Sequence, residues 1–207
     1  MDALIRLAGA AAPMPQNDIN TDLIAPLART AGGGMRPGIR TPAELAQLLF
    51  ATSRFEQDGT ERPAFVLNQP PFRAARFIIA GRNFACGSSR ESAVLMLKAF
   101  GIRCVIAPSF GSIFYDNCFR NHVLPLTLDE PLVEHLAVVA AGGGTFTLEV
   151  ESSTLTAPDG TAVAYSIPSF RRELLLSGAD EVAVTLGRAA EIDAYEARVS
   201  AERPWEL

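Results

Sequence analysis

Residues 75–127 alternate short apolar runs with segments of helical character, and this order constrains the fold more than any other feature of the chain. The runs ARFIIAG and IRCVIAPSF are rich in β-branched and aromatic residues, which favour strands. A helical segment follows each run, the first of them stopped by Gly101, and HVLPL then returns to extended chain. Strands that alternate with helices are typical of a parallel α/β unit, which we expect over residues 75–122.

The C-terminal part of the chain carries a different pattern. The run TFTLEVESSTLTAPDGTAVAYSI alternates apolar and polar residues around a Pro158-Asp159-Gly160 turn, which is typical of antiparallel hairpins. Helices are expected at SFRRELLLSG and at RAAEIDAYEARV. The predicted fold class is therefore α/β, with mixed parallel and antiparallel strands.

The N-terminal part of the chain is less regular. Residues 4–27 are broken by prolines and by the polar cluster QNDINTD, which suggests two short strands around a turn. The run AFVLN, residues 64–68, predicts a further strand. TPAELAQLLF predicts a helix, with Thr41 as N-cap, Pro42 at the first position and Glu44 completing a capping box.

Length and charge exclude several classes of protein. The chain has 207 residues, enough to bury a full core, and is most simply one domain. Its formal net charge of -5 provides no basic surface for nucleic acid. No run of about 18 apolar residues is present, so no membrane span is expected. Asp2 stands where a secretory signal would carry basic residues, so we expect a cytoplasmic protein.

Cysteine and histidine are sparse. Cys86, Cys104 and Cys118 are too far apart for a C-x-x-C site, and their odd number in a chain without a signal suggests reduced thiols. Cys104 and Cys118 are expected to act as small buried hydrophobes. Because His122 and His135 have no metal-ligating residue at a suitable spacing, no metal site built by this chain alone is expected.

The stretch GRNFACGSSRESAVLMLKAFG, residues 81–101, has two interpretations. The spacing Ser88-x-x-Glu91 fits a capping box, in which the serine would only satisfy backbone N–H groups at a helix start. The alternative is a binding site. One cap needs one serine, Gly87 lets a ligand approach the backbone, and a helix N-terminus beside Arg90 suits a carboxylate or a phosphate.

Familiar phosphate and nucleophile motifs do not fit this turn. A P-loop needs a different glycine spacing and a lysine, and no dinucleotide-binding G-x-G-x-x-G follows a strand. The turn also lacks the G-x-S-x-G of a hydrolase elbow. A small organic carboxylate is the ligand that fits best, with one serine left to act chemically.

A second candidate segment is the loop ARTAGGGMRPGIRT, which spans residues 28–41. It is rich in glycine and carries Arg29, Arg36 and Arg40. Long loops of this kind are often functional lids or recognition loops. A flexible surface excursion is the alternative interpretation.

Three segments together resemble one known family. GRNFACGSSRES, IAPSFGSIFYDNCFRNHVLPL and NDINTDLIAP are similar to the small subunits of 3-isopropylmalate dehydratase, the swivel-domain members of the aconitase superfamily. The resemblance extends over nearly the whole chain, including FVLN and SFRRELLLSGADEVAVTL. The glycine–serine–serine–arginine–glutamate core, combined with the downstream segment, is more specific than any single short motif.

The resemblance implies a swivelling β/β/α three-layer domain over residues 1–207. Within it, residues 28–41 would be a flexible substrate-recognition loop and residues 187–207 a C-terminal helix and tail. It also implies a partner, a large subunit that carries a [4Fe–4S] cluster, and no cofactor bound by this chain. The implied reaction is the interconversion of 2-isopropylmalate and 3-isopropylmalate by dehydration and rehydration, in leucine biosynthesis.

The same resemblance assigns site residues. Ser88 corresponds to the serine that acts as the base, Ser89 and Arg90 to its substrate-binding neighbours, and Arg29 lies in the substrate-discriminating loop. No metal ligand is assigned in this chain. Because dehydration needs a base and a Lewis acid, the Lewis acid is expected on the partner.

The chain departs from the family pattern at Ala85, where glycine is usual, and at Ser92, where histidine is usual. The histidine would be a titratable neighbour of the base, so its loss affects the electrostatics of the site. Three alternatives stay open. The chain could serve a related hydro-lyase acting on citraconate or methylmalate, dimethylmaleate or aconitate. It could be a non-catalytic carboxylate-binding paralogue, or a regulatory carboxylate-binding module with no enzyme partner.

Overall fold

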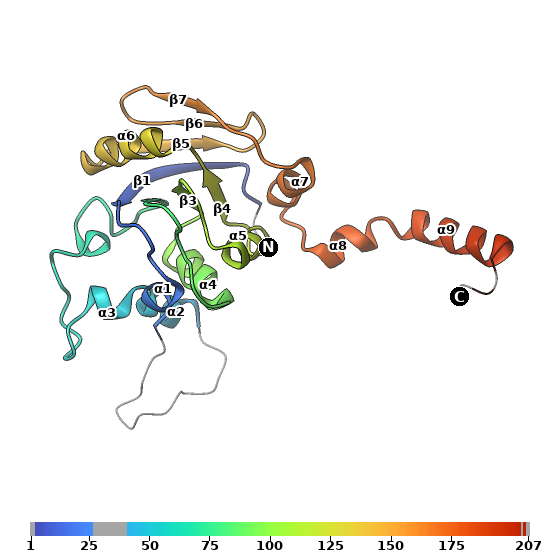
Figure 1. Ribbon diagram of the computed structural model, residues 1–207, viewed down its shortest axis with the longest axis horizontal. Coiled ribbons are helices and arrows are strands. Elements are labelled where there is room, and N and C mark those ends of the chain that lie inside the picture. Colours follow the sequence, from blue (N-terminus) through green and yellow to red (C-terminus); the bar gives the residue numbers. More distant parts are fainter. Residues whose placement is uncertain (1–2, 27–40, 204, 206–207) are drawn as a thin grey trace.

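The computed structural model of the protein describes residues 3–26, 41–203 and 205 (Figure 1). Its strands in these ranges are β1 (Arg6–Met14), β2 (Phe77–Ala80), β3 (Cys104–Ala107), β4 (Leu124–Thr127), β5 (Thr145–Glu149), β6 (Thr154–Thr156) and β7 (Ala162–Ala164). Its helices are α1 (Thr21–Ile24), α2 (Pro42–Leu48), α3 (Ala51–Arg54), the 3-10 helix η1 (Val66–Asn68), α4 (Glu91–Phe100), α5 (Ser112–Arg120), α6 (Glu130–Ala141), α7 (Ser169–Ser177), α8 (Glu181–Leu186) and α9 (Ala189–Glu202).

These strands form one mixed sheet, in the order β4-β3-β2-β1-β5-β6-β7. The pairs β1–β2, β2–β3 and β3–β4 are parallel, with α4 and α5 as the crossovers after β2 and β3. Every residue of β2 and β3 is buried, as expected for parallel strands covered on both faces. The parallel α/β unit predicted over residues 75–122 is confirmed.

The other half of the sheet is antiparallel. Strand β1 is antiparallel to β5, β5 is antiparallel to β6, and β6 is antiparallel to β7. The Pro158-Asp159-Gly160 segment connects β6 to β7, and Gly160 has a φ of +89°, a conformation that favours glycine. The predicted hairpin and the mixed α/β fold class are confirmed.

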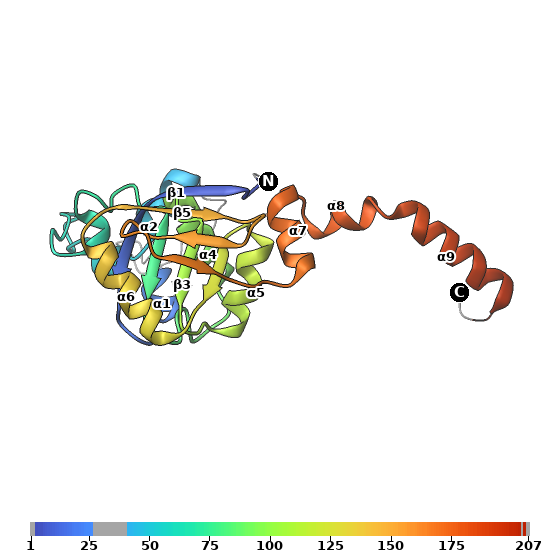
Figure 2. The same ribbon diagram turned by 90° about the horizontal axis from the view of Figure 1, so that it is seen from above.

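The sheet curls so that its two halves form separate layers (Figure 2). The rings of Phe77 in β2 and Phe146 in β5 lie 6.1 Å apart, within a core shared by the parallel and antiparallel strands. On the opposite face of the parallel strands, Ile78 and Val105 pack in a second core with Leu97 of α4. This arrangement has the β/β/α layering that the family resemblance implies.

Two predicted strands in the N-terminal part are wrong. Within the predicted range 4–27, the described residues 4–26 contain one strand and then the short helix α1. The Asn20 side chain accepts a hydrogen bond from the Leu23 amide at 2.9 Å and so caps a helical turn. Residues 64–68 form η1 instead of a strand. The buried Asn68 amide donates to the Arg54 carbonyl at 2.7 Å, and this contact outweighs the strand propensity of the run.

Other local predictions hold. The capping box of Thr41 and Glu44 is present, with Pro42 at the helix start. Gly101 ends α4 with a φ of +113°. The C-terminal helix is confirmed as α9, and it follows α8, which the sequence analysis did not assign.

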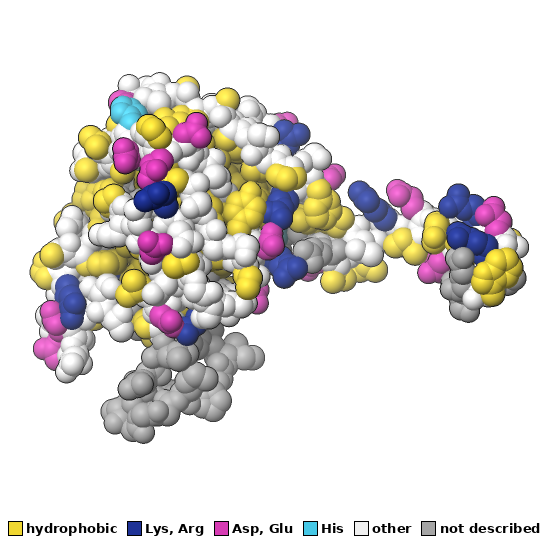
Figure 3. Space-filling view, viewed as in Figure 1, with side chains coloured by type: hydrophobic (Ala, Val, Ile, Leu, Met, Phe, Trp, Pro, Cys, Tyr) yellow, Lys and Arg dark blue, Asp and Glu magenta, His cyan; other side chains and the backbone are white. Residues whose placement is uncertain are grey.

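Helices α8 and α9 project away from the rest of the protein as an arm (Figures 1 and 2). This arm keeps several large apolar side chains exposed (Figure 3). They are Val182, Leu186, Ile192 and Tyr195, and Trp205, beyond the end of α9, is exposed as well. Among the described residues, no helix combines the length and the apolar composition needed to cross a bilayer.

The start of the arm is tied to the body by His122, which is only 1% exposed. Its Nε2 lies 3.2 Å from the carbonyl oxygen of Ala179, so this nitrogen carries the proton and donates. Nδ1 is buried with no hydrogen-bond partner among the described residues, so a second proton there would be unsatisfied. Burial, helped by the nearby charge of Lys98, lowers the pKa of His122.

His122 is therefore expected to make the folded state less stable in mild acid. The unfolded chain binds a proton near pH 6.5, the ordinary histidine pKa, whereas the folded chain binds it only at lower pH. The stability contributed by neutral His122 is complete above about pH 6.5 and decreases as the pH falls below it. Urea unfolding at pH 7 and pH 5 measures this. Asparagine suits the φ of +57° at this position, and His122→Asn should flatten the pH dependence. An unchanged slope in this variant would contradict the assignment.

Candidate active site

Two segments that are far apart in the sequence lie side by side at the carboxyl ends of β1 and β2. One follows β1 over residues 16–22, and the other follows β2 over residues 81–90. Ligands of α/β proteins bind at this edge of a parallel sheet. Backbone hydrogen bonds join the two segments: Asp18 N to Arg82 O at 2.9 Å, Ala85 N to Ile19 O at 2.6 Å, and Thr21 N to Cys86 O at 2.9 Å.

The serine–arginine turn lies on the surface of this region. Ser88 and Ser89 are exposed, and Arg90 is half-buried. The capping-box interpretation of Ser88 is wrong, because α4 starts at Glu91 with Arg90 as its N-cap and no side-chain cap. Gly87, with a φ of +98°, lies just before Ser88, and the Ser88 hydroxyl contacts side chains instead of the helix amides.

The Ser88 hydroxyl has two side-chain neighbours. Arg90 Nε donates a hydrogen bond to Ser88 Oγ at 3.1 Å. Thr21 Oγ1 lies 3.3 Å from the same oxygen and 3.1 Å from the Ser88 carbonyl oxygen. The hydroxyl is thus held by a cation on one side and by a second hydroxyl on the other, while its residue remains accessible to a ligand.

Arg90 already binds a carboxylate of its own chain. Its Nη2 forms an ion pair with Asp22, and its Nη1 donates to the Ala25 carbonyl oxygen at 3.1 Å. The Arg90 side chain is 20% exposed, whereas that of Asp22 is 65% exposed. The guanidinium is therefore fixed in position by the protein, and its carboxylate partner faces solvent.

The structure brings together three of the four predicted site residues, Ser88, Ser89 and Arg90. Arg29 and residues 28–40 of the predicted recognition loop lie outside the described residues. Thr21 and Asp22 belong to the site by their contacts, but sequence reasoning gave them no role. The sequence signal that points to both residues is the NDINTDLIAP segment, one of the three segments that carry the family resemblance.

The two departures from the family pattern lie at the edges of this site. Ala85 has a φ of +57°, so the chain retains a left-handed conformation at a position where the family usually has glycine. Such a conformation costs an L-residue about 1–2 kcal/mol. Ser92 is half-buried in the first turn of α4.

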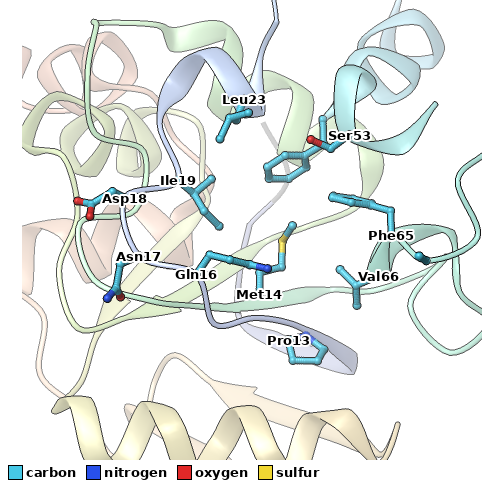
Figure 4. A pocket seen from close by; sticks show the side chains of 12 residues that line it. Pro13, Met14, Gln16, Asn17, Asp18, Ile19, Leu23, Ser53, Phe65 and Val66 are labelled. Atoms are coloured by element: carbon cyan, nitrogen blue, oxygen red, sulfur yellow. The ribbon is translucent and has the colours of Figure 1, made fainter. Parts of the chain in front are cut away.

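A cavity of about 410 Å³ adjoins the segment that carries Thr21 and Asp22 (Figure 4). Met14, Ile19 and Phe65 supply apolar walls, and Asn17 and Asp18 supply polar groups. A mixed lining of this kind suits a small molecule with apolar and polar parts.

The described residues offer no site for a metal. In these ranges no three His, Cys, Asp or Glu side chains come together as metal ligands would. Cys104 and Cys118 are fully buried, as predicted, and burial raises the pKa of both thiols. The fold gives His135 an acidic partner that its sequence neighbourhood did not suggest, Asp159 Oδ2 at 3.0 Å. Within residues 3–26 and 41–203, a [4Fe–4S] cluster thus finds no set of ligands.

The layered mixed sheet, with a serine–serine–arginine turn at the carboxyl edge of its parallel strands, defines an aconitase C-terminal domain. The family model of the aconitase C-terminal domain matches residues 1–131. A second family model, that of the C-terminal domain of the 3-isopropylmalate dehydratase small subunit, matches residues 181–207, which include α8 and α9. The chain belongs to the family of 3-isopropylmalate dehydratase small subunits.

Relatives match the chain over its full length. The 3-isopropylmalate dehydratase small subunit of Rhodospirillum centenum is 46% identical, with 100% of both chains covered. That of Dinoroseobacter shibae is 43% identical, with 99% of this chain and 100% of the relative covered. The crystal structure of a 3-isopropylmalate dehydratase from Methanocaldococcus jannaschii has a TM-score of 0.62 and 25% identity, covering 92% of this chain and 99% of that chain.

Proposed function

We propose that this chain is the small subunit of a 3-isopropylmalate dehydratase, which interconverts 2-isopropylmalate and 3-isopropylmalate in the cytoplasm during leucine biosynthesis. The observation that carries the proposal is the accessible Ser88, whose hydroxyl is held by Arg90 in a chain 46% identical to such a subunit. A serine in this position has the surroundings needed for a base.

Ser88 would act as an alkoxide. Arg90 Nε, at 3.1 Å, and the nearby N-terminus of α4 both place positive charge near its oxygen, which favours the ionised form. The alkoxide takes a proton from the substrate carbon next to a carboxylate. The electron pair of that C–H bond becomes the second bond of the alkene, while the neighbouring C–O bond breaks and hydroxide leaves. In the hydration direction Ser88 returns the same proton.

Ser89 and Arg90 would bind a substrate carboxylate, with Arg29 of the loop as a further contact. Since Arg90 already pairs with Asp22, the substrate carboxylate would take the place of an exposed side chain of the protein. Asp22, 65% exposed, can return to solvent when the substrate carboxylate takes its place on Arg90.

A large subunit would complete the site. A [4Fe–4S] cluster carried by that subunit supplies the Lewis acid for the leaving hydroxide. Two observations support a partner: the serine–arginine turn is open on this chain, and the arm exposes several apolar side chains. The whole chain, residues 1–207, would move as one swivelling domain that closes on the large subunit.

Anaerobic reconstitution with the large subunit tests the function. The complex is expected to turn over isopropylmalate with a kcat/KM about 10-fold or more above that for citraconate or aconitate, the scale on which a pocket distinguishes apolar groups. A preference for citraconate or aconitate would instead assign the chain to a related hydro-lyase. Failure to associate with any cluster-bearing subunit would favour a carboxylate-binding module.

A further inference from the structure

Thr21 is the buried neighbour of the proposed base. It is only 1% exposed, and its amide donates to the Cys86 carbonyl oxygen at 2.9 Å, which fixes its backbone beside the serine–arginine turn. Its side chain reaches both oxygens of Ser88, at 3.1 and 3.3 Å. Water is excluded from this contact on the threonine side.

Counting protons determines the direction of these hydrogen bonds. A threonine hydroxyl has one proton, and Thr21 donates it to the Ser88 carbonyl oxygen. The assignment that satisfies both contacts has the Ser88 hydroxyl donating to Thr21 Oγ1. Arg90 Nε donates to Ser88 Oγ from another direction. In the neutral site, the proton of Ser88 therefore points at Thr21.

Ionisation of Ser88 reverses this arrangement. An alkoxide has no proton to donate, and the Thr21 hydroxyl can turn so that its one proton lies between the Ser88 carbonyl oxygen and Ser88 Oγ, which are 3.1 and 3.3 Å away. A hydrogen bond to a charged acceptor is about twice as strong as one between neutral groups. Thr21 thus stabilises the ionised form of Ser88 more than the neutral form.

We propose that Thr21 is a positioning residue for the reaction, a hydrogen-bond partner that changes from acceptor to donor when Ser88 loses its proton. The inference rests on the proposed function, because it assumes that Ser88 is the base. Two charged side chains have described contacts around the Thr21–Ser88 pair. Arg90 donates to the Ser88 hydroxyl, and Asp22 forms an ion pair with Arg90. Glu91, the next acidic residue, is engaged by Asn121 Nδ2 at 3.1 Å.

The test compares Thr21→Val, which keeps the shape and removes the hydroxyl, with Thr21→Ser, which keeps the hydroxyl. In the complex with the large subunit, Thr21→Val should lower kcat about 10- to 100-fold, with KM changed less than about threefold. The pH profile of kcat in this variant should also move to higher pH by about one unit, as expected when the alkoxide becomes about tenfold less stable. Thr21→Ser should have the kcat and the pH profile of the wild type. Thr145→Val, at an exposed residue of β5, is the matched control and should behave like the wild type.

A double-mutant cycle completes the test. In a Ser88→Ala background, Thr21→Val should change residual turnover less than about twofold, because the partner hydroxyl is gone. Should Thr21→Val fail to fold, Thr21→Ala replaces it, with the same expectations. Wild-type kcat in the valine variant, an unshifted pH profile, or an equal loss in the Ser88→Ala background would each overturn the proposal. An inactive wild-type complex, or a fully active Ser88→Ala complex, would instead refute the proposed function.

Discussion

Replacing Ser88 with alanine is expected to lower turnover of the reconstituted complex roughly 10²- to 10⁴-fold, the usual range for a positioned acid–base group. The variant removes the oxygen that Arg90 Nε contacts at 3.1 Å. Substrate affinity should change little, because the proposed carboxylate contacts are made by Ser89 and Arg90. Steady-state kinetics with isopropylmalate, at equal occupancy of the large subunit, gives both quantities.

Ser152→Ala provides the matched control for this prediction, since Ser152 is exposed in the turn between β5 and β6. The control should have wild-type kcat and KM. A Ser88→Ala complex with near-normal turnover would remove Ser88 from the mechanism.

Arg90→Lys is expected to lower kcat/KM by about 10²-fold or more, the scale of losing one preorganised donor at a reacting oxygen. The lysine keeps the positive charge but has a single nitrogen. It cannot reproduce the three directed contacts of the guanidinium, which are Ser88 Oγ, the Ala25 carbonyl oxygen and the Asp22 carboxylate. We expect kcat to fall because the Ser88 alkoxide is less stable, and KM to rise because the substrate carboxylate is bound less well.

Arg62→Lys is the matched control, because Arg62 forms an exposed ion pair with Glu56 at 3.1 Å, away from the serine–arginine turn. Such pairs contribute little, and the variant should retain wild-type kinetics. If Arg90→Lys also retained wild-type kcat/KM, charge alone would suffice and the directed contacts would be irrelevant to catalysis.

The elements that sequence reasoning predicted correctly are those with a strong local signal. The apolar runs of β2 and β3 and the turn at Pro158-Asp159-Gly160 are determined by residues adjacent in the chain. The two wrong strands were each overridden by a polar side-chain contact, one local and one between separate elements. Asn20 caps a helical turn through the Leu23 amide, and the Asn68 side chain donates to the carbonyl oxygen of Arg54, the last residue of α3.

The same distinction applies to the site. Ser88, Ser89 and Arg90 are neighbours in the sequence, so their grouping could be predicted. Thr21 lies 67 positions before Ser88, and only the alignment of two loops at the ends of β1 and β2 makes it a partner. The capping-box interpretation failed because spacing alone does not reveal where the first helical turn begins, which is at Glu91.

The position of β1 in the chain and in the sheet affects how the protein can fold during synthesis. It is synthesised first, yet its neighbours β2 and β5 are translated much later, and both halves of the sheet use it as their common member. Pairings of such long sequence separation form slowly, and an unpaired strand edge on a nascent chain invites aggregation. N-terminal trimming into β1, or a bulky tag placed against it, would therefore damage both halves of the sheet.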